Sequence, residues 1–308
     1  MKYITILVPC YNEEESIPIF YKRVSQIIGS FVDINFDFLF VNDGSRDSTL
    51  AILEELSSHD ARVHYIDLSR NYGKEIAMIA GIDAIASDAM IIMDADLQDP
   101  PELIPELVNW WLQGYQDVYA KRRSRDGETW FKKWSSHQYY KLLQRVTRIP
   151  IQQDVGDFRL LDRVCIDALK QFRESQRYTK GFFSWIGFKK KEVLFDREPR
   201  VAGETKWNYT ALVGLAIDGI TSFTIMPLRI ATFLGFTVSF FSLLYIIYIF
   251  LKTLIYGDPV PGYPSLMSVI LFLGGGQFML MGVIGEYLGR TFNESKHRPL
   301  YFIQYKNF

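Results

Sequence analysis

The sequence predicts an α/β fold with a mostly parallel sheet, followed by interfacial helices and a hairpin of two membrane-spanning helices. Three observations predict it. Short apolar runs alternate with segments of helical periodicity over residues 1–120, polar residues follow directly on four of these runs, and two uncharged stretches, 230–251 and 259–285, come late in the chain. Alternating strands and helices favour a parallel sheet that is covered by helices on both faces.

The composition limits the class of protein. The 308 residues include 34 Lys and Arg and 35 Asp and Glu, which leaves a formal net charge of −1. This balance excludes a protein that binds nucleic acid through its overall charge. Because Cys10 and Cys165 are far apart in sequence, we expect two buried free thiols and no disulfide framework. The first apolar run is short and ends at Pro9, so we expect no signal peptide.

The elements of the predicted sheet follow one another in order. The strands are Ile4–Val8, Phe36–Val41, Val63–Leu68, Ala89–Met93 and Asp117–Ala120. Between them, apolar residues recur at helical spacing: Ile17, Tyr21, Val24 and Ile28, then Ile52, Leu53 and Leu56, then Ile76, Ile79 and Ala80. Ligands of such sheets bind outside the carboxyl ends of the strands. The residues that follow each strand are therefore the candidate site.

The first two strands end in polar segments. The first runs into Pro9–Glu13, and Pro9 ends ladder pairing there. The second runs into Asn42–Ser45, where Asp43 can accept hydrogen bonds from a base or a ribose and Gly44 allows a tight turn. Each segment alone has a structural alternative, a helix cap for the first and an Asx turn for the second.

The third and fourth strands end in charged segments. Arg70–Lys74 places two cations and a glycine at a predicted helix start, which suits contacts to phosphate or sugar. In Asp94–Asp99, two carboxylates at i and i+2 are hard oxygen ligands that suit Mg²⁺ or Mn²⁺ held jointly with a diphosphate. An acidic turn in solvent is the alternative. Polar clusters at four successive strand ends together predict a site for a nucleoside diphosphate and a divalent cation.

These motifs resemble those of family 2 glycosyltransferases of the polyprenyl-phosphate type, which include dolichol-phosphate mannosyltransferase and the bactoprenol glucosyltransferases. The matching segments run along nearly the whole chain: Pro9–Glu13, Asn42–Ser45, Asn71–Lys74, Asp94–Asp99, Gly156–Arg159, Arg200–Lys206 and Gly285–Arg290. The resemblance implies a Rossmann-like GT-A catalytic domain, an inverting transfer of enzyme class EC 2.4 and a UDP-sugar donor. The Gln-x-x-Arg-Trp motif of processive polysaccharide synthases is missing from the sequence, which argues against chain polymerisation.

The resemblance also implies roles for single residues. Asp43 would contact the uracil or the ribose, Asp94 and Asp96 would hold the metal and the donor diphosphate, and Asp157 would lie at the reacting centre. The expected catalytic residues are Asp157, Asp96 and Arg200. The expected donor-binding residues are Pro9, Tyr11, Asn12, Glu13, Asp43, Lys74, Asp94, Ala95, Gln98 and Lys206.

A lipid phosphate is the expected acceptor. Residues 121–148 carry nine basic residues with aromatic residues between them, which is typical of a basic helix at an anionic membrane surface; a solvated helix face is the alternative. Guanidinium groups match phosphate geometry, so we expect Arg122, Arg123 or Arg200 to bind the acceptor phosphate, and the sequence does not rank them. A phosphate monoester has a second pKa of about 6 and is already anionic at pH 7. Asp157 is therefore interpreted as a positioning group rather than an obligatory base.

The uncharged stretches predict a transmembrane hairpin, because each exceeds the roughly 20 residues that cross a bilayer. Basic residues flank the hairpin and its loop carries one lysine, so the positive-inside rule places both chain ends in the cytoplasm. The expected divisions are a cytosolic GT-A domain (1–206), interfacial amphipathic helices (207–228), the hairpin (229–289, with spans about 230–251 and 265–285) and a basic cytosolic tail (290–308).

The expected reaction moves one sugar from a UDP-sugar to undecaprenyl phosphate at the bacterial cytoplasmic membrane. Glucose is the first choice of sugar, N-acetylglucosamine the second and an aminoarabinose-type sugar the third. A separate flippase and a downstream transferase would carry the sugar onto a cell-envelope glycan, and relatives of this type suggest a homo-oligomer, a tetramer. The alternatives are a non-catalytic membrane-bound sensor or scaffold that binds a nucleotide-sugar, and a transporter, which the lack of ionisable residues in the spans disfavours.

Overall fold

The computed structural model describes residues 1–123, 155–174, 179–196, 226–256 and 262–308. The chain divides into two compact units, one of Met1–Gly219 with Pro299–Phe308 and one of Ile220–Arg298. The predicted site residues Arg200 and Lys206 lie outside the described residues, as do most of the predicted basic helix and of the predicted interfacial helices.

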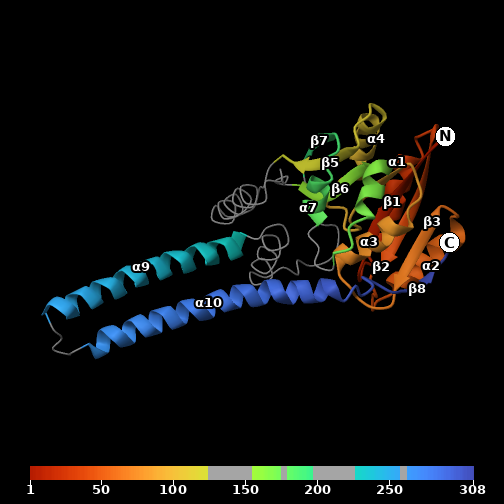
Figure 1. The fold of residues 1–308 in the computed structure, drawn as a ribbon. Coiled ribbons are helices and arrows are strands. Elements are labelled where there is room, and N and C mark those ends of the chain that lie inside the picture. The colour runs from red at the N-terminus through yellow and green to blue at the C-terminus, as the bar shows by residue number, and fades with distance from the viewer. Residues whose placement is uncertain (124–154, 175–178, 197–225, 257–261) are drawn as a thin grey trace. The chain divides into compact units, whose positions relative to one another are not determined.

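The first unit is built on a sheet with the strand order β7-β5-β6-β4-β1-β2-β3-β8 (Figure 1). The strands are β1 (Lys2–Cys10), β2 (Ile34–Asn42), β3 (Val63–Leu68), β4 (Ala89–Ile92), β5 (Asp117–Arg122), β6 (Val155–Asp162), β7 (Lys190–Phe195) and β8 (Ile303–Lys306). Strands β1 to β4 are parallel, whereas β6 runs antiparallel to both β4 and β5, and β8 runs antiparallel to β3. The sheet is therefore mixed, and because β5 and β7 are also parallel to each other, four of its seven neighbouring strand pairs are parallel.

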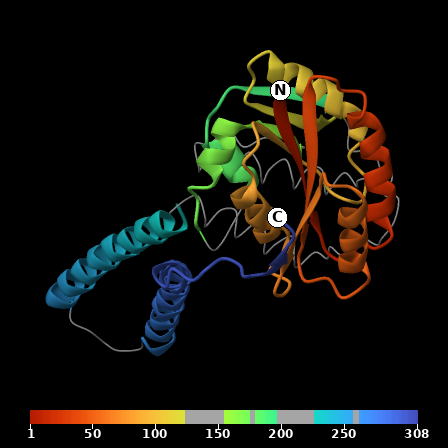
Figure 2. The same ribbon diagram turned by 90° about the vertical axis from the view of Figure 1, so that its right-hand side faces the viewer.

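Helices cover both faces of this sheet, with α1 and α2 on one side and α3 on the other (Figure 2). The helices of this unit are α1 (Ser16–Ile28), α2 (Thr49–His59), α3 (Lys74–Ala84), the 3₁₀ helix η1 (Pro101–Leu103), α4 (Ile104–Leu112), α6 (Arg163–Leu169) and α7 (Thr179–Trp185). The alternation of strand residues explains the two layers. Ile6 belongs to the core that contains Phe20 of α1, whereas Leu7 contacts α3, where a Cβ on Gly81 would lie 2.1 Å from Leu7 Cδ1.

The five predicted strands and the helical periodicities between them are confirmed within a few residues at each end. Both cysteines are free and buried, as predicted. The sequence interpretation did not include β6, β7 or β8. The last of these turns part of the predicted tail into an edge strand of the sheet, where the Asn307 amide accepts the Tyr65 N–H at 2.8 Å.

A buried ion pair joins β5 to β6. Arg159 Nη1 lies 3.2 Å from Asp117 Oδ2, and both side chains are almost completely buried, at 1% and 0% exposure. Lys190 of β7 lies 3.6 Å from the same carboxylate, and the Arg159 guanidinium stacks on the Phe183 ring at 3.8 Å. Arg159 belongs to one of the matching motifs, but its side chain forms a buried ion pair in the interior of the sheet domain.

The second unit holds two long helices, α9 (Met226–Tyr256) and α10 (Tyr263–Ser295), which contain the predicted spans (Figure 1). Among the residues that the structure describes, no helix is both long enough and apolar enough to cross a membrane. Large apolar side chains are exposed along both helices, among them Phe236, Phe272 and Phe278, each at least 70% exposed.

Candidate active site

The carboxyl ends of β1, β2 and β3 lie side by side, since Cys10 pairs with Asn42 and Asn42 with Asp67. Asp43 follows β2 directly and ties the neighbouring turns together. Its carboxylate accepts the backbone N–H groups of Tyr72 at 2.7 Å and Gly73 at 2.8 Å, and its own N–H donates to the Cys10 carbonyl. Burial raises the pKa of Asp43, and the two N–H donors partly oppose that rise. Asp43, which was predicted to contact uracil or ribose, therefore holds the loop after β3 by two hydrogen bonds.

Gly44 lets the turn after β2 pass close to that loop. Its φ is +62°, and a Cβ at this position would lie 2.5 Å from the Arg70 carbonyl carbon. A side chain would therefore push the two turns apart.

Asn12 and Glu13 connect the first turn to the second. Asn12 has a φ of 54° and its side-chain oxygen accepts the Arg46 N–H at 2.9 Å, while the Glu13 N–H donates to the Thr49 hydroxyl at 2.9 Å. A hollow of about 360 Å³ opens beside them, lined by Asn12, Glu13, Glu14, Glu15, Ser16, Arg46 and Asp47. Pro9 and Tyr11 are half-buried at the same edge.

A charged cluster brings three of the predicted residues together. Lys74 Nζ lies 2.6 Å from Asp94 Oδ1 and 2.6 Å from Asp157 Oδ2. Asp157 reaches this edge because β6 runs antiparallel to β4, so the start of β6 lies beside the end of β4. Burial alone would lower the pKa of Lys74, but the charges of Asp157 and Asp94 outweigh it and raise that pKa.

The loop after β4 turns tightly through the predicted metal-binding residues. Asp96 accepts the Gln98 N–H at 3.2 Å, Ala95 is buried, and Leu97 has a φ of 56°, which is rare for a side chain of this size. Across the described ranges, no three His, Cys, Asp or Glu side chains group into a metal site. The carboxylate oxygens of the predicted pair, Asp94 and Asp96, are suitable ligands for a hard divalent cation. The prediction assigns further ligands to the donor diphosphate.

Asp99 is the site residue that the sequence interpretation missed. It is 6% exposed, and its Oδ1 atom has no hydrogen-bond partner among the described residues. Burial raises the pKa of Asp99 to about 7; the charge of Asp94 adds to the rise, and Arg122 and Lys74 oppose it. The signal in the sequence was its place in the acidic segment after β4.

The structure separates the two neighbouring arginines at the end of β5. Arg122 lies beside Gly156 and Asp99, since a Cβ on Gly156 would lie 3.9 Å from Arg122 Nη2 and 3.7 Å from Asp99 Oδ2. Arg123 instead pairs with Asp196 at 3.2 Å, and its side chain is largely exposed. Of the two candidate acceptor-phosphate groups that the structure describes, Arg122 is therefore the one beside Asp99 and Gly156.

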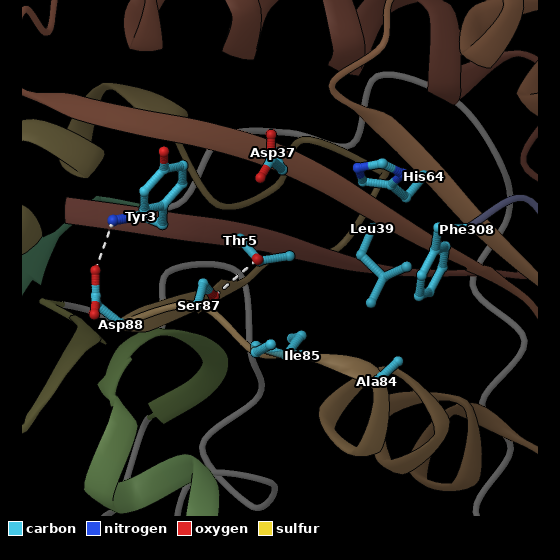
Figure 3. Close-up of a pocket in the computed structure, with 11 residues that line it drawn as sticks. Tyr3, Thr5, Asp37, Leu39, His64, Ala84, Ile85, Ser87, Asp88 and Phe308 are labelled. Atoms are coloured by element: carbon cyan, nitrogen blue, oxygen red, sulfur yellow. Dashed lines mark hydrogen bonds between the residues drawn. The ribbon is translucent and has the colours of Figure 1, made fainter. Parts of the chain in front are cut away.

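A hollow of about 390 Å³ lies at the opposite end of the strands (Figure 3). It is lined by residues from the first half of β1, such as Tyr3 and Thr5, together with Asp37, His64 and Phe308. None of the predicted site residues lines it.

Comparison with known proteins decides the family. Residues 5–169 match the family described as glycosyl transferase family 2, and residues 226–291 match the GtrB C-terminal hairpin. An uncharacterized glycosyltransferase of Synechocystis sp. is 49% identical over 97% of this chain and 94% of its own length. The chain belongs to glycosyltransferase family 2. A protein of Shigella phage SfV named bactoprenol glucosyl transferase is 43% identical to this glycosyltransferase over 98% of both chains.

The family membership confirms the resemblance found in the motifs and favours an enzyme over the non-catalytic alternative. The mixed α/β sheet agrees with the GT-A fold that the family 2 motifs imply. The crystal structure of glucosyl-3-phosphoglycerate synthase from Mycobacterium tuberculosis, which is 18% identical, covers 71% of this chain and 78% of its own with a TM-score of 0.48.

The buried carboxyl of Asp99 makes the stability of the glycosyltransferase depend on pH. Its pKa is about 7 in the folded chain, against about 3.9 in an unfolded one. A raised pKa means that this group's contribution to stability is fully present below about pH 3.9 and is lost as the pH rises through its folded value. Asp99→Asn stays neutral, so we expect it to raise the free energy of unfolding at pH 8 by up to a few kcal/mol, at about 1.4 kcal/mol per pKa unit.

Thermal unfolding without metal or nucleotide, at pH 5 and pH 8, measures this difference. The gain from Asp99→Asn should be larger at pH 8 than at pH 5. Asp33→Asn changes an exposed carboxylate and serves as the control, with no gain expected at either pH. An equal gain from Asp99→Asn at both pH values would contradict the assignment.

Proposed function

We propose that this glycosyltransferase moves one sugar from a UDP-sugar to undecaprenyl phosphate at the cytoplasmic face of a bacterial membrane. The observation that carries the proposal is the cluster of Lys74, Asp94 and Asp157 at the carboxyl edge of the sheet, with Arg122 beside it. The name of the phage relative, a bactoprenol glucosyl transferase similar over nearly the whole chain, supports the lipid acceptor and makes glucose the first choice of sugar. N-acetylglucosamine is the second choice.

The residues divide the chemistry among them. One oxygen of the acceptor phosphate forms the new bond to the anomeric carbon while the bond from that carbon to the β-phosphate of UDP breaks, and the configuration inverts. Asp94 and Asp96 would hold Mg²⁺ or Mn²⁺, which supplies positive charge to the departing diphosphate. Asp157 orients the cations of the site. It does not need to remove a proton, because the acceptor is already an anion.

Arg122 should be the arginine that binds the acceptor phosphate. Hydrogen bonds to charged groups contribute about 1.5–3 kcal/mol, so Arg122→Met should raise the KM for the lipid phosphate by about tenfold to a hundredfold. The matched variant Arg123→Met removes the exposed partner of Asp196 and should leave this KM nearly unchanged. Steady-state kinetics with varied lipid phosphate measures both. A larger effect at Arg123 would reverse the assignment.

The second unit would hold the enzyme at the membrane. Its exposed large apolar side chains, such as Phe236 and Phe278, are typical of a surface that meets lipid or protein. The match to the GtrB C-terminal hairpin supports a hairpin of two helices in this unit. The proposal adds that both helices cross the membrane and that both chain ends lie in the cytoplasm. In this arrangement the product would need a separate flippase and a downstream transferase to reach a cell-envelope glycan.

Reporter fusions test this topology. A reporter that is active only outside the cytoplasm should be active when it is inserted at Asp258, between the two helices, and inactive when it is fused after Phe308. The basic residues that flank the hairpin are the reason for this orientation. An inactive Asp258 reporter in a protein that is expressed at the wild-type level would exclude the hairpin.

A donor screen tests the proposed reaction. Full-length protein in detergent is incubated with undecaprenyl phosphate, Mg²⁺ or Mn²⁺, and one UDP-sugar at a time. The lipid products are identified by mass spectrometry. The proposal expects one lipid-phosphate-sugar product, with UDP-glucose as the first donor to give it. UDP binding without a lipid product from any UDP-sugar would overturn the proposal.

A further inference from the structure

Lys74 engages both oxygens of a carboxylate that the proposed metal site needs. Its Nζ lies 2.6 Å from Asp94 Oδ1 and 2.9 Å from Asp94 Oδ2, so the ammonium sits across the whole carboxylate. On its other side, Asp157 Oδ2 lies 2.6 Å away. Lys74 therefore bridges a predicted metal ligand and the predicted reacting centre.

We propose that Lys74 is a placeholder cation: it neutralises Asp94 in the ligand-free enzyme, and it passes to the donor diphosphate when the divalent ion takes Asp94. This inference rests on the proposed function, because it assumes that Asp94 binds a divalent ion and that UDP binds beside it. It adds a consequence that the reaction alone does not require, namely that the metal and UDP bind cooperatively through one lysine.

The ammonium of Lys74 and a divalent ion would compete for the charge of Asp94. Mg²⁺ binds a carboxylate oxygen at about 2.0–2.1 Å, whereas the ammonium already contacts both oxygens at hydrogen-bond distance. A divalent ion at either oxygen would lie against the ammonium, and the repulsion between like charges would displace the lysine. Metal alone must therefore bind against the repulsion of this ammonium or displace it from Asp94.

The position of Lys74 in the fold allows it to move. It is the first residue of α3 and follows Gly73, whose φ is +94°. Its side chain is 42% exposed and has a flexible four-carbon stem. A helix N-terminus disfavours a cation, so anions hold the lysine in place. The diphosphate of the donor provides a new anionic partner for Lys74 when the metal binds Asp94.

Reciprocal coupling between the metal and UDP is the measurable consequence. The affinity for Mn²⁺, followed by electron paramagnetic resonance, is determined with and without UDP for the wild type, Lys74→Met and Lys74→Arg. In the wild type, UDP should tighten Mn²⁺ binding. Lys74→Met removes the competing cation, so Mn²⁺ alone should bind about tenfold more tightly, and the gain from UDP should fall by about the same factor, within the range common for coupled sites.

Lys74→Arg is the matched control, since it keeps a cation that can bridge the two carboxylates and should keep most of the coupling. Circular dichroism shows whether each variant is folded, and Lys74→Gln replaces Lys74→Met if the latter is not. The inference is overturned if Lys74→Met keeps the coupling of the wild type. It is also overturned if Lys74→Met tightens Mn²⁺ binding equally with and without UDP, because the lysine would then only repel the metal and would not couple it to UDP. A wild type that binds neither Mn²⁺ nor UDP would overturn the proposed function itself.

Discussion

Asp96→Ala should lower kcat for sugar transfer by about a hundredfold or more, the cost typical of losing one group that stabilises developing charge in a transition state. The reason is that Asp96 would hold the divalent ion against the departing diphosphate, where most of the negative charge develops. Asp157→Asn should cost less, because the amide oxygen can still accept the hydrogen bond of Lys74 and because the acceptor phosphate needs no proton acceptor.

Both variants are compared by kcat at saturating donor and acceptor, with circular dichroism to confirm that they fold. Asp157 is a matched comparison because it is also a carboxylate beside the end of β4. Equal kcat values for the two variants would contradict the division of roles between a metal ligand and a positioning group.

Asp117→Ala should destabilise the catalytic unit by about 3–5 kcal/mol, the usual cost of leaving a buried charge without its partner. Asp117 is completely buried between Arg159 and Lys190, and its loss would leave both cations in an apolar interior. Denaturant unfolding of the full-length protein measures the effect. The double variant Asp117→Ala with Arg159→Met should recover part of the lost stability, because it also removes the more deeply buried of the two unpaired cations.

Glu192→Ala is the control for this prediction. Glu192 pairs with Lys121 at 2.9 Å on the same side of the sheet, but both side chains are partly exposed, at 46% and 35%. Exposed ion pairs contribute up to about 1 kcal/mol. A loss for Asp117→Ala no larger than that for Glu192→Ala would show that the buried pair is not what stabilises β5 against β6.

The parallel half of the fold could be predicted from the sequence because its information is local. Each strand is a short apolar run, and each helix repeats its apolar residues at helical spacing. The antiparallel strands carry no such signal. In β6, polar residues such as Asp157 and Arg159 interrupt the apolar pattern, and β8 pairs with a strand more than 200 positions earlier, which no local pattern reports.

The site shows the same limit. Asp94, Lys74 and Asp157 were predicted from motifs, and the antiparallel register of β6 explains why they meet. The choice between Arg122 and Arg123 could not be made from the sequence, because it depends on where β5 ends. The strand ends at Arg122, whereas Arg123 lies beyond the strand and pairs with Asp196. Asp99 was missed because its burial depends on the packing of β5 and β6 beside it.

A comparison of two acceptors tests the central claim most directly. Full-length enzyme is given the same UDP-glucose and Mg²⁺ with either undecaprenyl phosphate or undecaprenol, which differ only in the phosphate, and the lipid products are quantified by mass spectrometry. The account predicts a product with the phosphate alone, because the anion is the nucleophile and Arg122 binds it, and predicts that a chelator removes the product. Comparable transfer to undecaprenol, or transfer that persists after metal removal, would contradict it.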